Sequence, residues 1–206
     1  GGDGEALVVC NDGTLYLLTP GKPFGPRKIM EGVKKAACWG VNMVLRNDGT
    51  LWTWGFNNDG QLGNGSTQSF YSPQQAGMIM SGVSDITSGD RHAMAIKTDG
   101  TLWGCGNNDY GKIGVGTKQE CVKTPTQILS GVRSVITASN HTLAILNNGT
   151  LMAWGSNFDG ALGDGTKIHR RKPVKIHTNV SKAASGDTFT VFITNDGNFF
   201  FTGSFE

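Results

Sequence analysis

The stretch D-G-T-L-W-T-W-G-F-N-N-D-G-Q-L-G-N-G, residues 48–65, holds an Asp-Gly turn, a short aromatic strand and a glycine-rich loop. An Asp-Gly or Asn-Gly pair between apolar runs predicts a β-hairpin in which both turn residues take positive φ. Full copies recur at residues 99–116 and 148–165, a shorter copy lies at 196–204, and a degenerate copy starts at Asp12. A copy roughly every 50 residues indicates an array of one supersecondary unit.

Each turn follows a small-residue segment and an apolar run, as in S-G-D-R-H-A-M-A-I at residues 88–96. One full unit therefore holds four predicted strands, at 83–87, 92–96, 101–105 and 124–129, with the glycine-rich loop between the third and the fourth. Four strands of about five residues, with their turns, account for roughly 50 residues. We expect an all-β protein of four-stranded antiparallel blades repeated radially, which is a β-propeller.

The chain forms a single predicted domain, residues 1–206, with about five blade units. Their approximate bounds are 5–30, 32–80, 82–130, 131–178 and 179–206. The first unit lacks an innermost strand, and the last stops before a glycine-rich loop and an outer strand. The pattern fits either a small ring of about five blades or a part of a larger ring. Incomplete end blades would expose an apolar face and favour self-association.

Composition narrows the function classes. Charged residues make up 17% of the 206 residues and the formal net charge is +2, which argues against a nucleic-acid partner held by bulk positive charge. No apolar run approaches the ~20 residues of a membrane span, so no membrane insertion is expected. The four cysteines show no C-x-x-C spacing and are predicted to be structural free thiols. The low charge and the residue usage favour a bacterial protein that is secreted or exposed on the cell surface.

The recurring polar motifs are interpreted as structural. The order Gly-Thr-Lys at 116–118 reverses that of a phosphate-binding loop, and no closing Glu marks a calcium loop. Asn57, Asn108 and Asn157 hold one repeat position and are expected to satisfy backbone groups inside their loops. His92 and His141 share a slot with Val and Phe, which indicates a packing position with a local polar partner. We predict no enzyme activity, no cofactor and no metal site.

The combined pattern is G-x-x-H-T-x-A-I followed by D-G-T-L-x-x-W-G-x-N-x-x-G-x-L-G-x-G. It resembles the repeat of the regulator of chromosome condensation (RCC1) family and covers nearly the whole chain. The resemblance implies a β-propeller, usually of seven blades, and several uses: nucleotide exchange on a small GTPase, inhibition of a secreted enzyme, and contact with chromatin. No residue of the chain selects one of these uses.

The turns between the innermost strand and its neighbour vary from copy to copy. In a propeller they would gather at one end of the central channel, and exposed Trp and Arg are frequent anchors of protein interfaces. We therefore predict a non-enzymatic protein–protein interaction scaffold with a partner protein. The candidate partner-binding residues are Trp39, Asp90, Arg91, Asn140 and Asp187.

Two further surfaces are candidates. His169, Arg170, Arg171 and Lys172 form the only dense basic run, predicted to be a basic patch on a variable loop. Tyr71, Tyr110 and Phe158 are candidate exposed aromatics for an alternative function, a surface-exposed module that binds carbohydrate or cell wall. A secreted enzyme inhibitor or an exchange-factor-like regulator is a further alternative.

Overall fold

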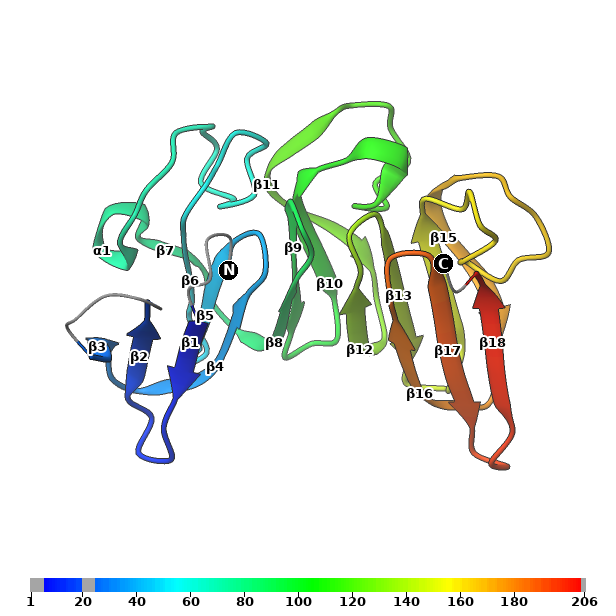
Figure 1. Cartoon of the computed structure of the whole chain (residues 1–206), viewed down its shortest axis with the longest axis horizontal. Coiled ribbons are helices and arrows are strands. Elements are labelled where there is room, and N and C mark those ends of the chain that lie inside the picture. The colour runs from blue at the N-terminus through cyan, green and yellow to red at the C-terminus, as the bar shows by residue number, and fades with distance from the viewer. Residues whose placement is uncertain (1–5, 20–24, 205–206) are drawn as a thin grey trace.

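The computed structural model describes residues 6–19 and 25–204, which form five antiparallel sheets standing side by side (Figure 1). Blade 1 is the sheet β1-β2-β3, with β1 (Ala6–Val9), β2 (Leu15–Leu18) and β3 (Arg27–Met30). Blade 2 holds β4 (Val33–Cys38), β5 (Asn42–Arg46), β6 (Leu51–Trp54) and β7 (Met78–Met80). Blade 3 holds β8 (Val83–Ser88), β9 (His92–Lys97), β10 (Leu102–Asn107) and β11 (Cys121–Leu129).

Blade 4 holds β12 (Val132–Thr137), β13 (His141–Leu146), β14 (Leu151–Gly155) and β15 (Arg170–His177). Blade 5 is the sheet β16-β17-β18, with β16 (Val180–Ser185), β17 (Phe189–Thr194) and β18 (Phe199–Gly203). Two short helical turns lie in the loops, α1 (Pro73–Ala76) and η2 (Asp109–Gly111). The prediction of an all-β propeller with incomplete first and last blades is confirmed for the described residues.

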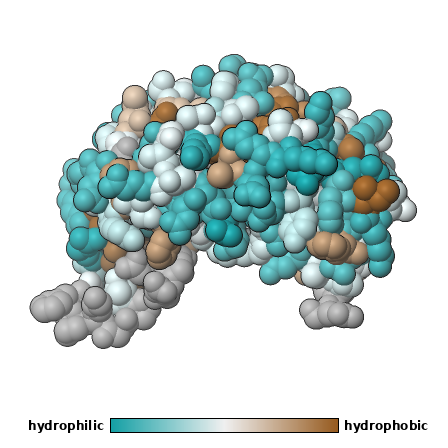
Figure 2. Space-filling view, turned by 90° about the horizontal axis from the view of Figure 1, so that it is seen from above, coloured by the Kyte–Doolittle hydropathy of each residue, from teal (hydrophilic) through white to brown (hydrophobic). Residues whose placement is uncertain are grey.

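The blades are arranged radially. The innermost strands of neighbouring blades contact one another, β4 with β8, β8 with β12 and β12 with β16. Seen from above, the molecule is an arch with a concave lower side (Figure 2). An arch of sheets that converge on their innermost strands is the geometry of propeller blades around a channel.

The hairpin turns have the predicted sequence but not the predicted conformation. Gly49 has φ 78°, whereas no Asp or Asn before a turn glycine has positive φ among the described residues. The Gly49 amide donates to Arg46 O at 3.0 Å, and Asp48 Oδ1 accepts from the Thr50 amide at 3.0 Å. The hairpin is therefore a type I turn followed by a glycine in a bulge, which needs positive φ at the glycine alone.

The turns also join the blades. In blades 1 to 4, the carbonyl of the turn glycine accepts a hydrogen bond from the first residue of the next innermost strand, at 2.8–2.9 Å. These pairs are Gly13 with Val33, Gly49 with Val83, Gly100 with Val132, and Gly149 with Val180. Each blade is thus fixed to its successor by main-chain groups, independently of the side chains at the turn.

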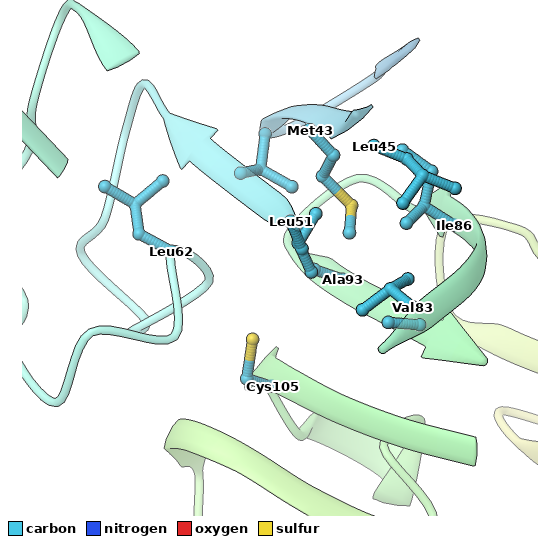
Figure 3. Packing of buried hydrophobic residues seen from close by; sticks show 10 residues of the cluster. Met43, Leu45, Leu51, Leu62, Val83, Ile86, Ala93 and Cys105 are labelled. Carbon is cyan, nitrogen blue, oxygen red and sulfur yellow. The ribbon is translucent and has the colours of Figure 1, made fainter. Parts of the chain in front are cut away.

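The core lies between blades rather than within one sheet. Met43, Leu45 and Leu51 of blade 2 pack against blade 3 residues that include Ile86 and Cys105 (Figure 3). Burial raises the pKa of the Cys105 thiol to about 12, which fits its predicted role as a small apolar core residue. Two equivalent clusters fill the spaces between blades 3 and 4 and between blades 4 and 5.

Blade 5 presents apolar side chains that occupy core positions in the earlier blades. Ile193, Phe199 and Phe201 are exposed to 40%, 65% and 37%, whereas Ile145 and Leu151, the repeat equivalents of the first two, are exposed to at most 1%. The apolar character of this face agrees with the expectation from sequence. Whether it mediates self-association remains a prediction.

Candidate functional site

Two kinds of connection meet at one end of the blades. The first kind is the four inner turns, residues 39–41, 89–91, 138–140 and 186–188, which join the innermost strand to its neighbour. The second is the glycine-rich loops 55–77, 108–120 and 156–169, which leave the third strand of each blade on the same side (upper side of Figure 1). We call this end the loop end. The Asp-Gly and Asn-Gly turns lie at the opposite end, so the predicted clustering of the inner turns is observed.

Each glycine-rich loop is organised around its buried asparagine. Asn57 Oδ1 accepts from the Leu62 amide at 2.9 Å, and Asn57 Nδ2 donates to Ser66 O and Gln68 O at 3.1 and 2.9 Å. Asn108 and Asn157 make equivalent bonds in their own loops. The prediction that these residues satisfy backbone groups is confirmed, and the loops form a fixed rim around the inner turns.

The first inner turn rests on blade 3. The Trp39 amide donates to Ser88 Oγ at 3.1 Å, and a Cβ added to Gly40 would lie 1.2 Å from the Asp90 carbonyl oxygen. Only glycine allows this close approach of two backbones. The Trp39 backbone is therefore held, while its side chain remains 44% exposed. Trp39 is a surface residue at the loop end, as the candidate binding role requires.

A cleft of about 430 Å³ opens beside this turn, between blades 2 and 3. Trp39 and Phe56 supply its aromatic walls, and Phe56 is 52% exposed. The polar lining comes from Asn58, Asp59, Gln61, Asp90 and Arg91. Three of the five candidate partner-binding residues thus lie in one cleft. Phe56 was not singled out from sequence because Asn107 and Ser156 hold its position in the other copies.

One of the two carboxylates of the cleft is paired with a cation and the other is not. Arg91 Nη2 lies 2.6 Å from Asp59 Oδ2, and Asp59 Oδ1 accepts from Asn107 Nδ2 at 3.3 Å. The Asp59 side chain is only 15% exposed, so the pair neutralises a largely buried carboxylate. The carboxylate of Asp90 is exposed and makes no ion pair or hydrogen bond within residues 6–19 and 25–204.

Asn140 and Asp187 belong to a second group at the loop end, in blades 4 and 5. Lys112, from the glycine-rich loop of blade 3, reaches this group: it is 2% exposed and donates from Nζ to Ser139 O at 3.2 Å and to Asn140 Oδ1 at 3.1 Å. Ser139 Oγ in turn donates to Asp187 Oδ1 at 2.6 Å. Burial lowers the pKa of the Lys112 ammonium. Lys112, Asn140, Ser139 and Asp187 are therefore connected by hydrogen bonds across blades 3, 4 and 5.

Sequence reasoning missed Lys112, although a signal exists. The repeat position is Gln61 in blade 2, Lys112 in blade 3 and Ala161 in blade 4, so one copy alone carries a long cation. Gln61 does not reach across: its Oε1 accepts from the Asp59 amide of its own loop at 3.0 Å. The lysine at this position therefore joins the loop of blade 3 to blade 4 by hydrogen bonds.

The two repeat histidines are packing residues, as predicted. His92 and His141 are 0% and 1% exposed. His92 Nε2 lies 3.2 Å from Thr142 Oγ1 of the next blade, and His141 Nε2 lies 3.3 Å from Thr190 Oγ1. Burial lowers their pKa values to about 3 and about 4. Both imidazoles are therefore neutral interblade contacts.

The structure corrects the predicted setting of the basic run at residues 169–172, whose role as a basic patch stays a prediction. First, residues 170–172 are not a loop but the start of β15, because they pair with β14. Second, the four side chains differ in their contacts, and among the described residues only Arg170 pairs with an acid. Arg170 Nε pairs with Asp164 Oδ2 at 2.6 Å, Arg171 Nη1 donates to Thr117 O at 3.4 Å, and His169 Nδ1 accepts from the Asn157 amide at 2.9 Å. Lys172 remains exposed.

The aromatic candidates form two clusters. Tyr110, Phe158 and His169 lie together on the loops of blades 3 and 4, with ring centroids 4.3–5.4 Å apart. Tyr71 lies elsewhere, at an edge-to-face contact of 6.2 Å with Phe56 beside the cleft. The structure therefore separates Tyr71 from the other two predicted aromatics.

Within the described parts of the chain, no group of three His, Cys, Asp or Glu side chains could hold a metal ion. None of the helices described there is long and apolar enough to cross a membrane.

Comparison with known proteins agrees with the repeat and the blades. The Regulator of chromosome condensation (RCC1) repeat matches residues 48–96, 99–145 and 148–193. Protein RCC2 of Homo sapiens is 29% identical over 96 residues, which are 46% of this chain and 18% of that protein. The Ultraviolet-B receptor UVR8 of Arabidopsis thaliana is 35% identical over 88 residues, 42% of this chain and 20% of the receptor. Both relatives are eukaryotic and give no support to a bacterial setting.

Solved structures extend the likeness to the whole fold. Human WBSCR16 superposes with a TM-score of 0.79 at 21% identity, over 97% of this chain and 59% of that one. Prp20p from Saccharomyces cerevisiae superposes with a TM-score of 0.80 at 19% identity, over 98% of this chain and 54% of that one. The chain spans little more than half the length of these propellers. It belongs to the RCC1 repeat family.

Proposed function

We propose that the loop end of this propeller is a non-enzymatic recognition platform for a partner protein. The observation that carries the proposal is the cleft between blades 2 and 3, where Trp39 and Phe56 are exposed on backbones that the neighbouring blade and the glycine-rich loop hold in place. Aromatic side chains presented on a fixed backbone lose little entropy on binding, which is the usual basis of an interface anchor.

The names of similar proteins support a protein partner. One structure of yeast RCC1 (Prp20) is a complex with Kap60, and another concerns the binding of Prp20p to Gsp1p and histones. These partners belong to those proteins. For this chain they support a protein ligand without identifying it, and exchange-factor-like regulation and inhibition of a secreted enzyme are two uses that the same face could serve.

The test is affinity capture with the purified chain as bait. The variant Trp39→Ala/Arg91→Ala/Asp187→Ala removes three side chains from the loop end, whereas the control Gln127→Ala/Lys175→Ala/Lys182→Ala removes three exposed side chains from the strands. A partner retained by wild type and control but lost from the loop-end variant supports the proposal. Equal capture by all three folded proteins refutes this face. Circular dichroism first checks that the loop-end variant is folded, and only folded proteins are compared.

A second candidate function rests on the cluster of Tyr110, Phe158 and His169. Phe158 is 58% exposed, and exposed rings beside polar groups are suited to the apolar face of a sugar ring. Binding to a glycan array that is lost on Phe158→Ala but kept in the Trp39→Ala/Arg91→Ala/Asp187→Ala variant would favour a carbohydrate module. A blank array would remove this candidate.

A further inference from the structure

We propose that the cleft between blades 2 and 3 receives a cationic side chain of the partner, an arginine in preference to a lysine, between the Trp39 indole and the Asp90 carboxylate. The inference rests on the proposed role of the loop end in partner binding and specifies the chemistry of the ligand.

The first step of the argument is the balance of charge in the cleft. Four ionised groups lie in or beneath it: Asp59, Asp90, Arg91 and Lys112. Arg91 is occupied by Asp59 at 2.6 Å. The Lys112 ammonium donates to Ser139 O and Asn140 Oδ1 of the next blade rather than to a cleft carboxylate. Asp90 acts on Lys112 only through space, and it is the one cleft carboxylate that makes no ion pair with a described cation.

The second step is the aromatic surface next to that carboxylate. The Trp39 indole is 44% exposed and lines the same cleft as Asp90, and the close approach of Gly40 to the Asp90 carbonyl fixes the two turns against each other. A Trp face is the best aromatic acceptor of a cation, and arginine is the more frequent donor. A guanidinium can stack on the ring and present its N–H groups to a carboxylate in one plane.

The third step excludes an anionic ligand. Arg91 is the only exposed cation of the cleft lining, and an anion would have to compete with Asp59 for it. Asp59 is only 15% exposed and would be left buried without its partner, which is unfavourable. A cationic ligand would leave the pair of Arg91 and Asp59 intact, because its partner Asp90 is exposed and unpaired before binding.

The experiment uses N-acetyl-arginine amide as the probe and N-acetyl-citrulline amide as its uncharged isostere. The signal followed is the ¹H–¹⁵N resonance of the Trp39 indole, assigned with the Trp39→Phe variant. We expect arginine amide to shift this resonance and citrulline amide to leave it in place. The shift should weaken at raised salt, because an exposed ion pair is screened.

Two matched variants make the result specific. Asp90→Asn should weaken arginine binding about threefold, as expected for loss of one exposed ion pair, whereas Asp159→Asn, an exposed acid of the loop end outside the cleft, should not. Equal shifts with citrulline, an unchanged affinity in Asp90→Asn, or no shift at about 50 mM probe would overturn the inference. Partner capture tests the platform separately, so a failed titration with intact capture refutes the cationic ligand alone.

Discussion

Replacing Gly40 by alanine should separate the turns of blades 2 and 3 and destabilise the chain by about 2–4 kcal/mol. The added Cβ would lie 1.2 Å from the Asp90 carbonyl oxygen, where ordinary contact begins at 3.4 Å, so the turns must move apart by about 2 Å. That movement breaks the 3.1 Å hydrogen bond from the Trp39 amide to Ser88 Oγ. The estimate combines the cost of overpacking with the loss of one hydrogen bond.

Thermal unfolding measures the effect. For a chain of this length, a loss of that size lowers Tm by roughly 4–15 °C. Gly25→Ala is the matched control, because nothing lies within 4 Å of a Cβ at that position. A Gly40→Ala protein that melts within about 1 °C of wild type would refute the claim that the two backbones are in contact. Gly40→Ala should also weaken arginine amide binding, since it would move apart the two turns that carry Trp39 and Asp90.

Three further outcomes are expected. Because the folded pKa values of His92 and His141 are about 3 and about 4 and the free value is 6.5, unfolded imidazoles bind protons that folded ones do not. Stability should therefore be full above pH 6.5 and fall by up to about 1.4 kcal/mol per pH unit per histidine as pH drops toward 4. Urea unfolding across this range should show a shallower fall for His92→Val/His141→Val, and an unchanged slope would contradict the assignment. Lys112→Gln should speed amide exchange of peptides covering residues 138–141 and 186–188, because a glutamine there would bond within its own loop, as Gln61 does. Lys118→Gln is the exposed control. Identical exchange in both variants would show that Lys112 does not hold blade 4. Phe199→Ser should lower concentration-dependent self-association in sedimentation velocity, since Phe199 is 65% exposed, and equal association of both proteins would exclude the blade 5 face.

Much of the fold was predictable because the repeat places apolar and glycine residues at fixed steps. The apolar run that ends at Ile96 indicates a strand buried on both faces, and all five residues at 92–96 are buried. Strand ends were less accurate: β11 begins at Cys121 rather than at residue 124, because its pairing with β10 resumes after a register shift and continues to Asn107. The turn type was wrong because Asp-Gly is compatible with two hairpin geometries.

The candidate site was predictable only in part. The repeat register located the inner turns, so Trp39, Asp90 and Arg91 could be placed at one end without coordinates. The contacts that these residues make could not be predicted from the sequence. The pairing of Arg91 with Asp59 and the reach of Lys112 into blade 4 depend on contacts between residues that lie 27 to 32 positions apart or in different blades. The basic run at 169–172 was assigned to a loop because its charge density gives no sign of the strand that begins at Arg170.

The hydrogen bonds from each turn glycine carbonyl to the next blade have a consequence for how this protein can diversify. They join main-chain atoms, at 2.8–2.9 Å, and lie at the end away from the cleft. This part of the cohesion between blades therefore does not depend on the identity of the side chains at the loop end. Substitutions of exposed inner-turn side chains such as Trp39 leave these main-chain hydrogen bonds intact, so the loop end is suited to the acquisition of new binding specificities.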